Sequence, residues 1–160
     1  MHFVLTPYSD ASFSIPILDS RSASGLVFLL NGVPIHWISR KQRLISLSST
    51  EAEIIASSLC AQELLWIMQV LDPIIKLEHP IELHIDNLSM KYVAESVLTS
   101  HRTKHLDLRY LFIRQLLNDY PVTLKWVPSE DNVADIFTKY FTTVGVFKGL
   151  VLKITADRHH

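Results

Sequence analysis

The chain has 160 residues, of which 48% are hydrophobic, so it suits one compact domain with a full core and is too apolar for a disordered protein. Its net charge of -1 at pH 7 excludes a global basic field, and any nucleic-acid binding must depend on local patches. The single cysteine, Cys60, excludes a disulfide framework and a cysteine-rich zinc site.

The first part of the chain has the pattern of a meander of strands. The segment HFVLTPYS, residues 2–9, predicts a first strand, and SASGLVFLLNGVPIHWIS, residues 22–39, predicts two more. Asn31-Gly32 between these two is the strongest short signal for a hairpin turn. We therefore expect an antiparallel arrangement at the start of the fold.

A long helix follows the strands. From residue 51 to residue 71 apolar side chains recur at helical spacing, mixed with polar ones. Asp72-Pro73 ends this helix, because proline disfavours helical geometry in the residue before it.

The rest of the chain alternates strands and helices. The predicted elements are a strand at 81–85, a short helix at 87–96, a helix at 104–119, a strand at 122–127, and a last helix that begins in VADIFTKYF, 133–141. Antiparallel pairing followed by this alternation indicates an α/β fold with a mixed sheet and helices on its faces. We assign 1–141 to one domain and leave 142–160 as an unassigned tail.

Two glutamates stand two residues apart where the long helix begins, in LSSTEAEIIASS. Ser48 with Glu51, or Thr50 with Glu53, has the spacing of a capping box, in which a hydroxyl and a carboxylate satisfy the free N–H groups of a helix start. Such a cap explains one glutamate and leaves the other without a structural role.

Four acidic residues lie at strand ends or helix starts. They are Asp10 in YSDAS, Glu53, Asp86 in HIDN and Asp135 in DNVAD. Each alone is an ordinary turn or first-turn residue. In an open α/β sheet, however, the carboxyl ends of parallel strands and the helix N-termini meet at one edge. Carboxylates without histidine or cysteine suit Mg²⁺ or Mn²⁺, and two such ions roughly 3.5–4 Å apart assist phosphoryl displacement.

The sequence resembles the ribonuclease H domain that closes the Pol polyprotein of copia-type LTR retrotransposons. The resemblance rests on YSDAS, RSASGLVFLLNGVPIHWISRKQ, LSSTEAEIIAS, HIDN, HRTKHLDLRYLFIRQ and VPSEDNVADIFTK in this order, from about Tyr8 to about Lys139. It implies a ribonuclease H-like fold, a five-stranded mixed sheet flanked by helices. It also implies metal-dependent endonucleolytic cleavage of the RNA strand of RNA:DNA hybrids, with a reverse transcriptase domain as neighbour in the parent polyprotein.

The resemblance also assigns the site. The family's metal-binding and catalytic acids fall on Asp10, Glu53, Asp86 and Asp135, and two Mg²⁺ ions are expected, for which Mn²⁺ can substitute. The ligand in related domains is the glutamate directly before an IIA-like segment, which matches Glu53, and Glu51 remains the helix-start residue. A histidine that many relatives carry before the last helix is missing from VPSEDN, so we expect a slower enzyme.

Two basic patches are candidates for substrate binding, SRKQR at 39–43 and HRTKH at 101–105. Their cations can contact phosphates without regard to sequence, although such a patch is commonly just a solvated surface. Asn87, beside Asp86, is a candidate contact to the 2′-hydroxyl groups of RNA. The candidate nucleic-acid-binding residues are Arg40, Lys41, Arg43, Asn87, Arg102 and Lys104.

Two other functions remain open at this point. A decayed retrotransposon relic would keep the fold as a nucleic-acid-binding or interaction domain without catalysis, but decay would be expected to strike the acids, and all four are present. An integrase or transposase core of the same general fold predicts glutamate last among its acids, whereas here Glu53 comes second. The chain has no signal-peptide pattern and no apolar run of membrane length, so we expect a soluble intracellular protein, in the cytoplasm or the nucleus.

Overall fold

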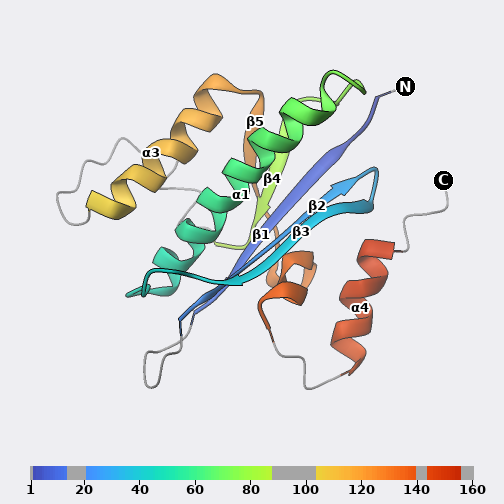
Figure 1. Cartoon of the computed structure of the whole chain (residues 1–160). Helices are drawn as coiled ribbons and strands as arrows, with labels where there is room; N and C mark the ends of the chain where they lie inside the picture. Colours follow the sequence, from blue (N-terminus) through green and yellow to red (C-terminus); the bar gives the residue numbers. More distant parts are fainter. Residues whose placement is uncertain (1, 14–20, 88–103, 140–143, 156–160) are drawn as a thin grey trace.

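The structure is a computed structural model that describes residues 2–13, 21–87, 104–139 and 144–155. Its elements follow one another along the chain as shown in Figure 1. They are β1 (Leu5–Ser12), β2 (Ala23–Leu30), β3 (Val33–Lys41), α1 (Ser49–Leu71), β4 (Ile81–Ile85), α3 (Lys104–Asp119), β5 (Val122–Trp126), the 3-10 turns η1 (Ser129–Asp131) and η2 (Val133–Phe137), and α4 (Val144–Thr155). The short helix predicted at 87–96 falls almost wholly outside the described residues.

The five strands form one mixed sheet in the order β3-β2-β1-β4-β5. The pairs β1–β2 and β2–β3 are antiparallel, whereas β1–β4 and β4–β5 are parallel. The prediction of a five-stranded mixed sheet is therefore confirmed. Because β1 and β4 run in the same direction side by side, their carboxyl ends lie at the same edge of the sheet.

The hairpin between β2 and β3 turns at the predicted dipeptide. Asn31 and Gly32 have positive φ angles of 49° and 76°, which glycine and asparagine adopt more readily than other residues. The Asn31 side chain also accepts a hydrogen bond from the Val4 backbone N–H at 2.8 Å. The turn thus joins two neighbouring strands and ties itself to the start of β1.

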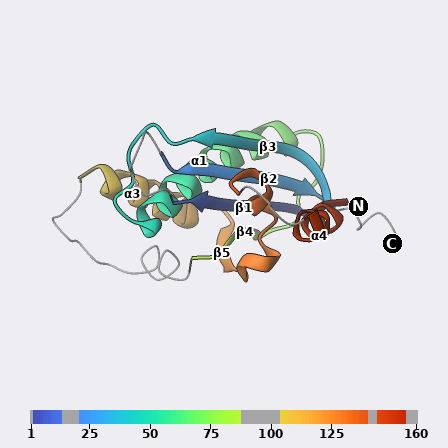
Figure 2. The ribbon, with the colours of Figure 1, turned by 90° about the horizontal axis from the view of Figure 1, so that it is seen from below.

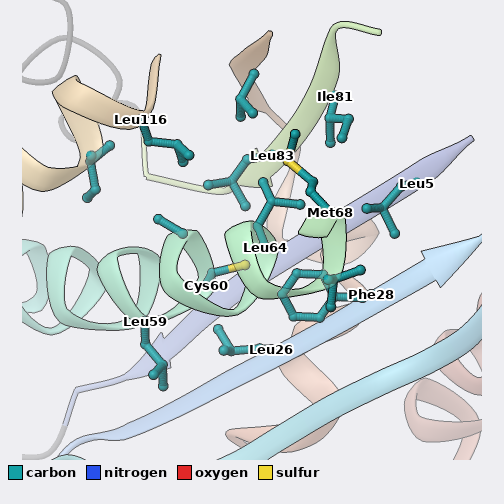
Figure 3. Close-up of a cluster of buried hydrophobic side chains, with 14 of the residues drawn as sticks. Leu5, Leu26, Phe28, Leu59, Cys60, Leu64, Met68, Ile81, Leu83 and Leu116 are labelled. Atoms are coloured by element: carbon teal, nitrogen blue, oxygen red, sulfur yellow. The ribbon is translucent and has the colours of Figure 1, made fainter. Parts of the chain in front are cut away.

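Helices α1 and α3 cover one face of the sheet, and η2 and α4 lie against the other, as Figure 2 shows. Helix α1 is long and apolar enough to span a membrane by length and composition alone. Most of its apolar side chains, however, are buried in the core: Cys60, Leu64 and Met68 of α1 lie in one cluster with side chains of the sheet and of α3 in Figure 3. This is the expected environment of a central helix in a layered α/β domain.

The segment 133–141 differs from its prediction. It contains the short 3-10 turn η2 in place of the start of a long helix, and the α-helix that follows, α4, begins only at Val144. Both ends of the turn are fastened to strands, since Asn132 donates to the Ser9 carbonyl at 2.9 Å and Ser39 donates to the Phe137 carbonyl at 2.6 Å. The short stretch between two fixed points forms a 3-10 turn, as short runs commonly do.

Candidate active site

Three acidic side chains meet at the sheet edge where β1 and β4 end. Asp10 lies on β1, two residues before the strand ends, Asp86 directly follows β4, and Glu53 lies near the N-terminus of α1. One carboxylate oxygen from each lies within 4.8 Å of the other two. The parallel pairing of β1 and β4 brings the two aspartates together, and packing of α1 on the sheet adds the glutamate.

The two glutamates of the helix start have different environments. Ser48 is the N-cap of α1 and accepts from the Glu51 N–H at 3.1 Å, while the Glu51 carboxylate accepts from the Leu47 N–H at 2.7 Å. Glu51 therefore satisfies backbone groups that the helix start leaves free. Glu53 instead points to β1, where it accepts from the Ala11 N–H at 3.1 Å.

Burial opposes the charge of two of these acids. Asp10 is 1% exposed and Glu53 8% exposed. Burial, with the neighbouring negative charges, raises the pKa of Asp10 from 3.8 to about 7 and the pKa of Glu53 from 4.5 to about 9. The raised pKa values show that the side chains around Asp10 and Glu53 do not fully neutralise the two carboxylates.

Asp135 lies near Asp10 but outside the group of three acids. It is buried in η2, where its charge contributes to the raised pKa of Asp10. Lys139 donates to its Oδ2 at 2.6 Å, and its Oδ1 is buried without a hydrogen-bond partner. The fourth predicted acid therefore has one oxygen held by a lysine and one unsatisfied.

These acids also accept hydrogen bonds from polar residues that were not among the predicted site residues. Ser129 donates to Asp86 Oδ2 at 3.0 Å, and Thr138 donates to Asp10 Oδ2. Thr138 and Lys139 follow Asp135 by three and four residues in ADIFTK. Residues three and four positions apart lie on one side of a helical turn. This spacing from Asp135 is the sequence feature that could have placed Thr138 and Lys139 at the site.

An all-oxygen group of this kind fits a hard divalent cation. Carboxylate oxygens are the ligands that Mg²⁺ and Mn²⁺ prefer, and a cation among them would offset the repulsion that raises the pKa values of Asp10 and Glu53. The unsatisfied Asp135 Oδ1 points to the same conclusion, because buried polar atoms in native proteins are rarely left without a partner.

The first basic patch lies at the end of β3, where Arg40 pairs with Ser24 of β2, which in turn pairs with Ala11 of β1. Arg40, Lys41 and Arg43 line a hollow of about 250 Å³ between the end of β3, α1 and α3, to which Arg109 of α3 adds a fourth cation. Arg109 is not among the residues predicted to bind nucleic acid. Arg102 and the side chain of Lys104 lie outside the described residues, and Asn87 directly follows Asp86 and is partly buried.

The chain is similar in sequence to polyproteins of plant transposons. It is 34% identical over 141 residues, 88% of the chain, to the retrovirus-related Pol polyprotein from transposon RE2 of Arabidopsis thaliana. It is 30% identical over 136 residues, 85% of the chain, to the retrovirus-related Pol polyprotein from transposon TNT 1-94 of Nicotiana tabacum. The chain spans only 10% of the length of each. No protein-family model matches it.

Solved structures with a similar fold include ribonucleases H. LC11 ribonuclease H1, isolated from compost by a metagenomic approach, superposes with a TM-score of 0.64 at 16% identity, over 84% of this chain and 92% of the other. The same enzyme in complex with an RNA/DNA hybrid gives a TM-score of 0.62 at 15% identity, over 84% and 93%. These findings confirm the resemblance predicted from the sequence: the chain is a ribonuclease H-fold relative of the retrovirus-related Pol polyproteins of plant transposons.

Proposed function

We propose that this chain is a metal-dependent nuclease that cleaves the RNA strand of RNA:DNA hybrids. The observation that carries the proposal is the convergence of Asp10, Glu53 and Asp86 from three separate elements to within 4.8 Å. Carboxylates held close together repel one another, and two of these three, Asp10 and Glu53, are also buried, which adds a free-energy cost when they are unpaired. A fold that brings the three together points to a use for them as a group.

Asp10, Glu53 and Asp86 would hold the metal, with Asp135 as the fourth candidate ligand. We expect two Mg²⁺ ions, or Mn²⁺ in their place, which when bound would stabilise the attacking and leaving oxygens of a phosphodiester. The contribution of the chain itself is to fix the acids. The Ala11 N–H donates to Glu53, Ser129 donates to Asp86, and Asp10 and Glu53 are buried.

The substrate proposal rests on the basic hollow at the end of β3 and on the related folds. The hollow lined by Arg40, Lys41, Arg43 and Arg109 offers several cations to the backbone phosphates of a nucleic acid. LC11 ribonuclease H1, which shares the fold, has been crystallised with an RNA/DNA hybrid. Asn87, next to Asp86, is our candidate contact to a 2′-hydroxyl.

We further propose that the chain works beside a reverse transcriptase domain. The support is that its relatives are Pol polyproteins and that it matches 10% of their length. In that setting the nuclease would remove RNA from the hybrid that the neighbouring polymerase produces.

To test the substrate class, the purified chain is incubated with four nucleic acids of the same sequence. They are an RNA:DNA hybrid, double-stranded RNA, double-stranded DNA and single-stranded RNA. We expect cleavage of the RNA strand of the hybrid alone, with Mg²⁺ and not with EDTA. Binding of the hybrid without any cleavage would favour the non-catalytic relic. Cleavage of double-stranded DNA would place the chain in another nuclease class.

A further inference from the structure

The side chain that touches Asp10 comes from the far end of the chain. Thr138, the residue that follows η2, donates its hydroxyl hydrogen to Asp10 Oδ2 across 128 positions of sequence. Its backbone N–H donates to the Asp135 carbonyl at 3.2 Å, which caps the turn. Thr138 therefore connects the turn that carries Asp135 to the strand that carries Asp10.

Gly25 of β2 makes this contact possible. It pairs with Asp10 in the β1–β2 register and lies directly under the turn. A Cβ atom on residue 25 would lie 2.6 Å from Thr138 Cγ2 and 2.7 Å from the Ala134 carbonyl oxygen. Any other residue at this position would push η2 away from the sheet, and the missing side chain is what lets Thr138 reach Asp10.

The contact matters because of how a carboxylate turns. The terminal torsion of an aspartate is broad and roughly two-fold, so a carboxylate held only by its backbone samples a range of orientations. A hydrogen bond to one oxygen fixes the carboxylate plane. Partners of this kind orient metal ligands in many proteins, and their loss typically costs about 10- to 100-fold in metal affinity or activity.

We propose that Thr138 is a positioning residue that orients the Asp10 carboxylate for a divalent cation, an inference that rests on the proposed function. The methyl group of Thr138 packs towards Gly25 and the hydroxyl group faces Asp10. Only the hydroxyl group of Thr138 would orient Asp10, whereas the methyl group would serve packing alone.

The test uses two substitutions at this position. Thr138→Val keeps the shape of the side chain and removes the hydroxyl group, whereas Thr138→Ser keeps the hydroxyl group and removes the methyl group. Thr123→Val is the matched control, because Thr123 is an exposed threonine on β5. The first measurement is calorimetric titration of the substrate-free proteins with Mg²⁺. The second separates kcat from KM for an RNA:DNA hybrid.

We expect Thr138→Val to weaken Mg²⁺ binding by about 10- to 100-fold and to lower kcat, with KM for the hybrid and the metal-free melting temperature close to those of wild type. Thr138→Ser and Thr123→Val should bind Mg²⁺ as wild type does. If Thr138→Val binds Mg²⁺ as tightly as wild type, or if Thr138→Ser is as defective as Thr138→Val, the positioning role is wrong. If wild type itself binds no Mg²⁺, both the proposed function and this inference fail.

Discussion

Replacing Glu53 with glutamine removes a buried ionisable group while keeping the shape of the side chain. In the folded protein, burial first and then the charges of Asp10 and Asp86 raise the pKa of Glu53 from 4.5 to about 9. The folded state therefore keeps a proton that the unfolded state releases. Without metal, the contribution of Glu53 to the free energy of unfolding is largest below its ordinary pKa of 4.5. The free energy of unfolding then falls as pH rises from about 4.5 towards 9.

The size of this effect follows from the pKa shift. Each pH unit between the unfolded and folded pKa values costs about 1.4 kcal/mol, so going from pH 4.5 to pH 7 costs wild type on the order of 3 kcal/mol. Glutamine does not titrate, and its carbonyl oxygen can still accept from the Ala11 N–H. Metal-free Glu53→Gln should therefore gain stability relative to wild type by this amount over the same pH range.

The assay is urea unfolding in EDTA at pH 4.5 and pH 7, with Glu51→Gln as the matched control. Glutamine at position 51 can still accept from the Leu47 N–H, and the variant loses only a charge near a helix N-terminus, worth about 0.3–1 kcal/mol. Its stability should follow that of wild type with pH. The reasoning is refuted if Glu53→Gln shows the same pH dependence as wild type, or if Glu51→Gln is the variant that loses it.

Three other predictions follow from the site and its surroundings. Millimolar Mg²⁺ should raise the melting temperature of wild type, because a cation that binds only the folded state stabilises it. Asp86→Asn should lose most of that rise, and equal shifts in the two proteins would argue against a metal site at Asp86. Gly25→Ala should lower the free energy of unfolding by about 1–3 kcal/mol, because its Cβ would meet Thr138 Cγ2 at 2.6 Å; an unchanged urea midpoint would contradict the close packing of η2. The double variant Arg40→Ala, Lys41→Ala should weaken hybrid binding equally across sequences and flatten the salt dependence by about one unit per lost phosphate contact; an unchanged slope would show that both side chains only face solvent.

The features that the sequence predicted correctly follow from short local motifs or from general rules of sheet architecture. Asn31-Gly32 gives the hairpin because few other pairs accept two positive φ angles in succession. The boundaries of α1 follow from the Ser48 cap at one end and from Asp72-Pro73 at the other. Convergence of Asp10 and Asp86 was predictable because parallel strands end at one edge of a sheet.

The features that the sequence did not predict depend on contacts between distant residues. The 3-10 form of η2 is set by two hydrogen bonds to strands, from Asn132 to the Ser9 carbonyl and from Ser39 to the Phe137 carbonyl. These join residues that lie 123 and 98 positions apart along the chain. Thr138 reaches Asp10 only because Gly25 leaves room. Arg109 joins the basic hollow through the packing of α3 on α1. Periodicity and local propensity carry no information about such contacts.

The assignment of the catalytic acids is tested most directly by the single-turnover cleavage rate of an RNA:DNA hybrid by wild type, Glu51→Gln and Glu53→Gln at increasing Mg²⁺ concentration. We expect wild type and Glu51→Gln to cleave the RNA strand with similar metal dependence. Glu53→Gln should be slower by orders of magnitude at every Mg²⁺ concentration while remaining folded. Metal-dependent cleavage that survives in Glu53→Gln, or that is lost in Glu51→Gln instead, would contradict the assignment of the catalytic acids.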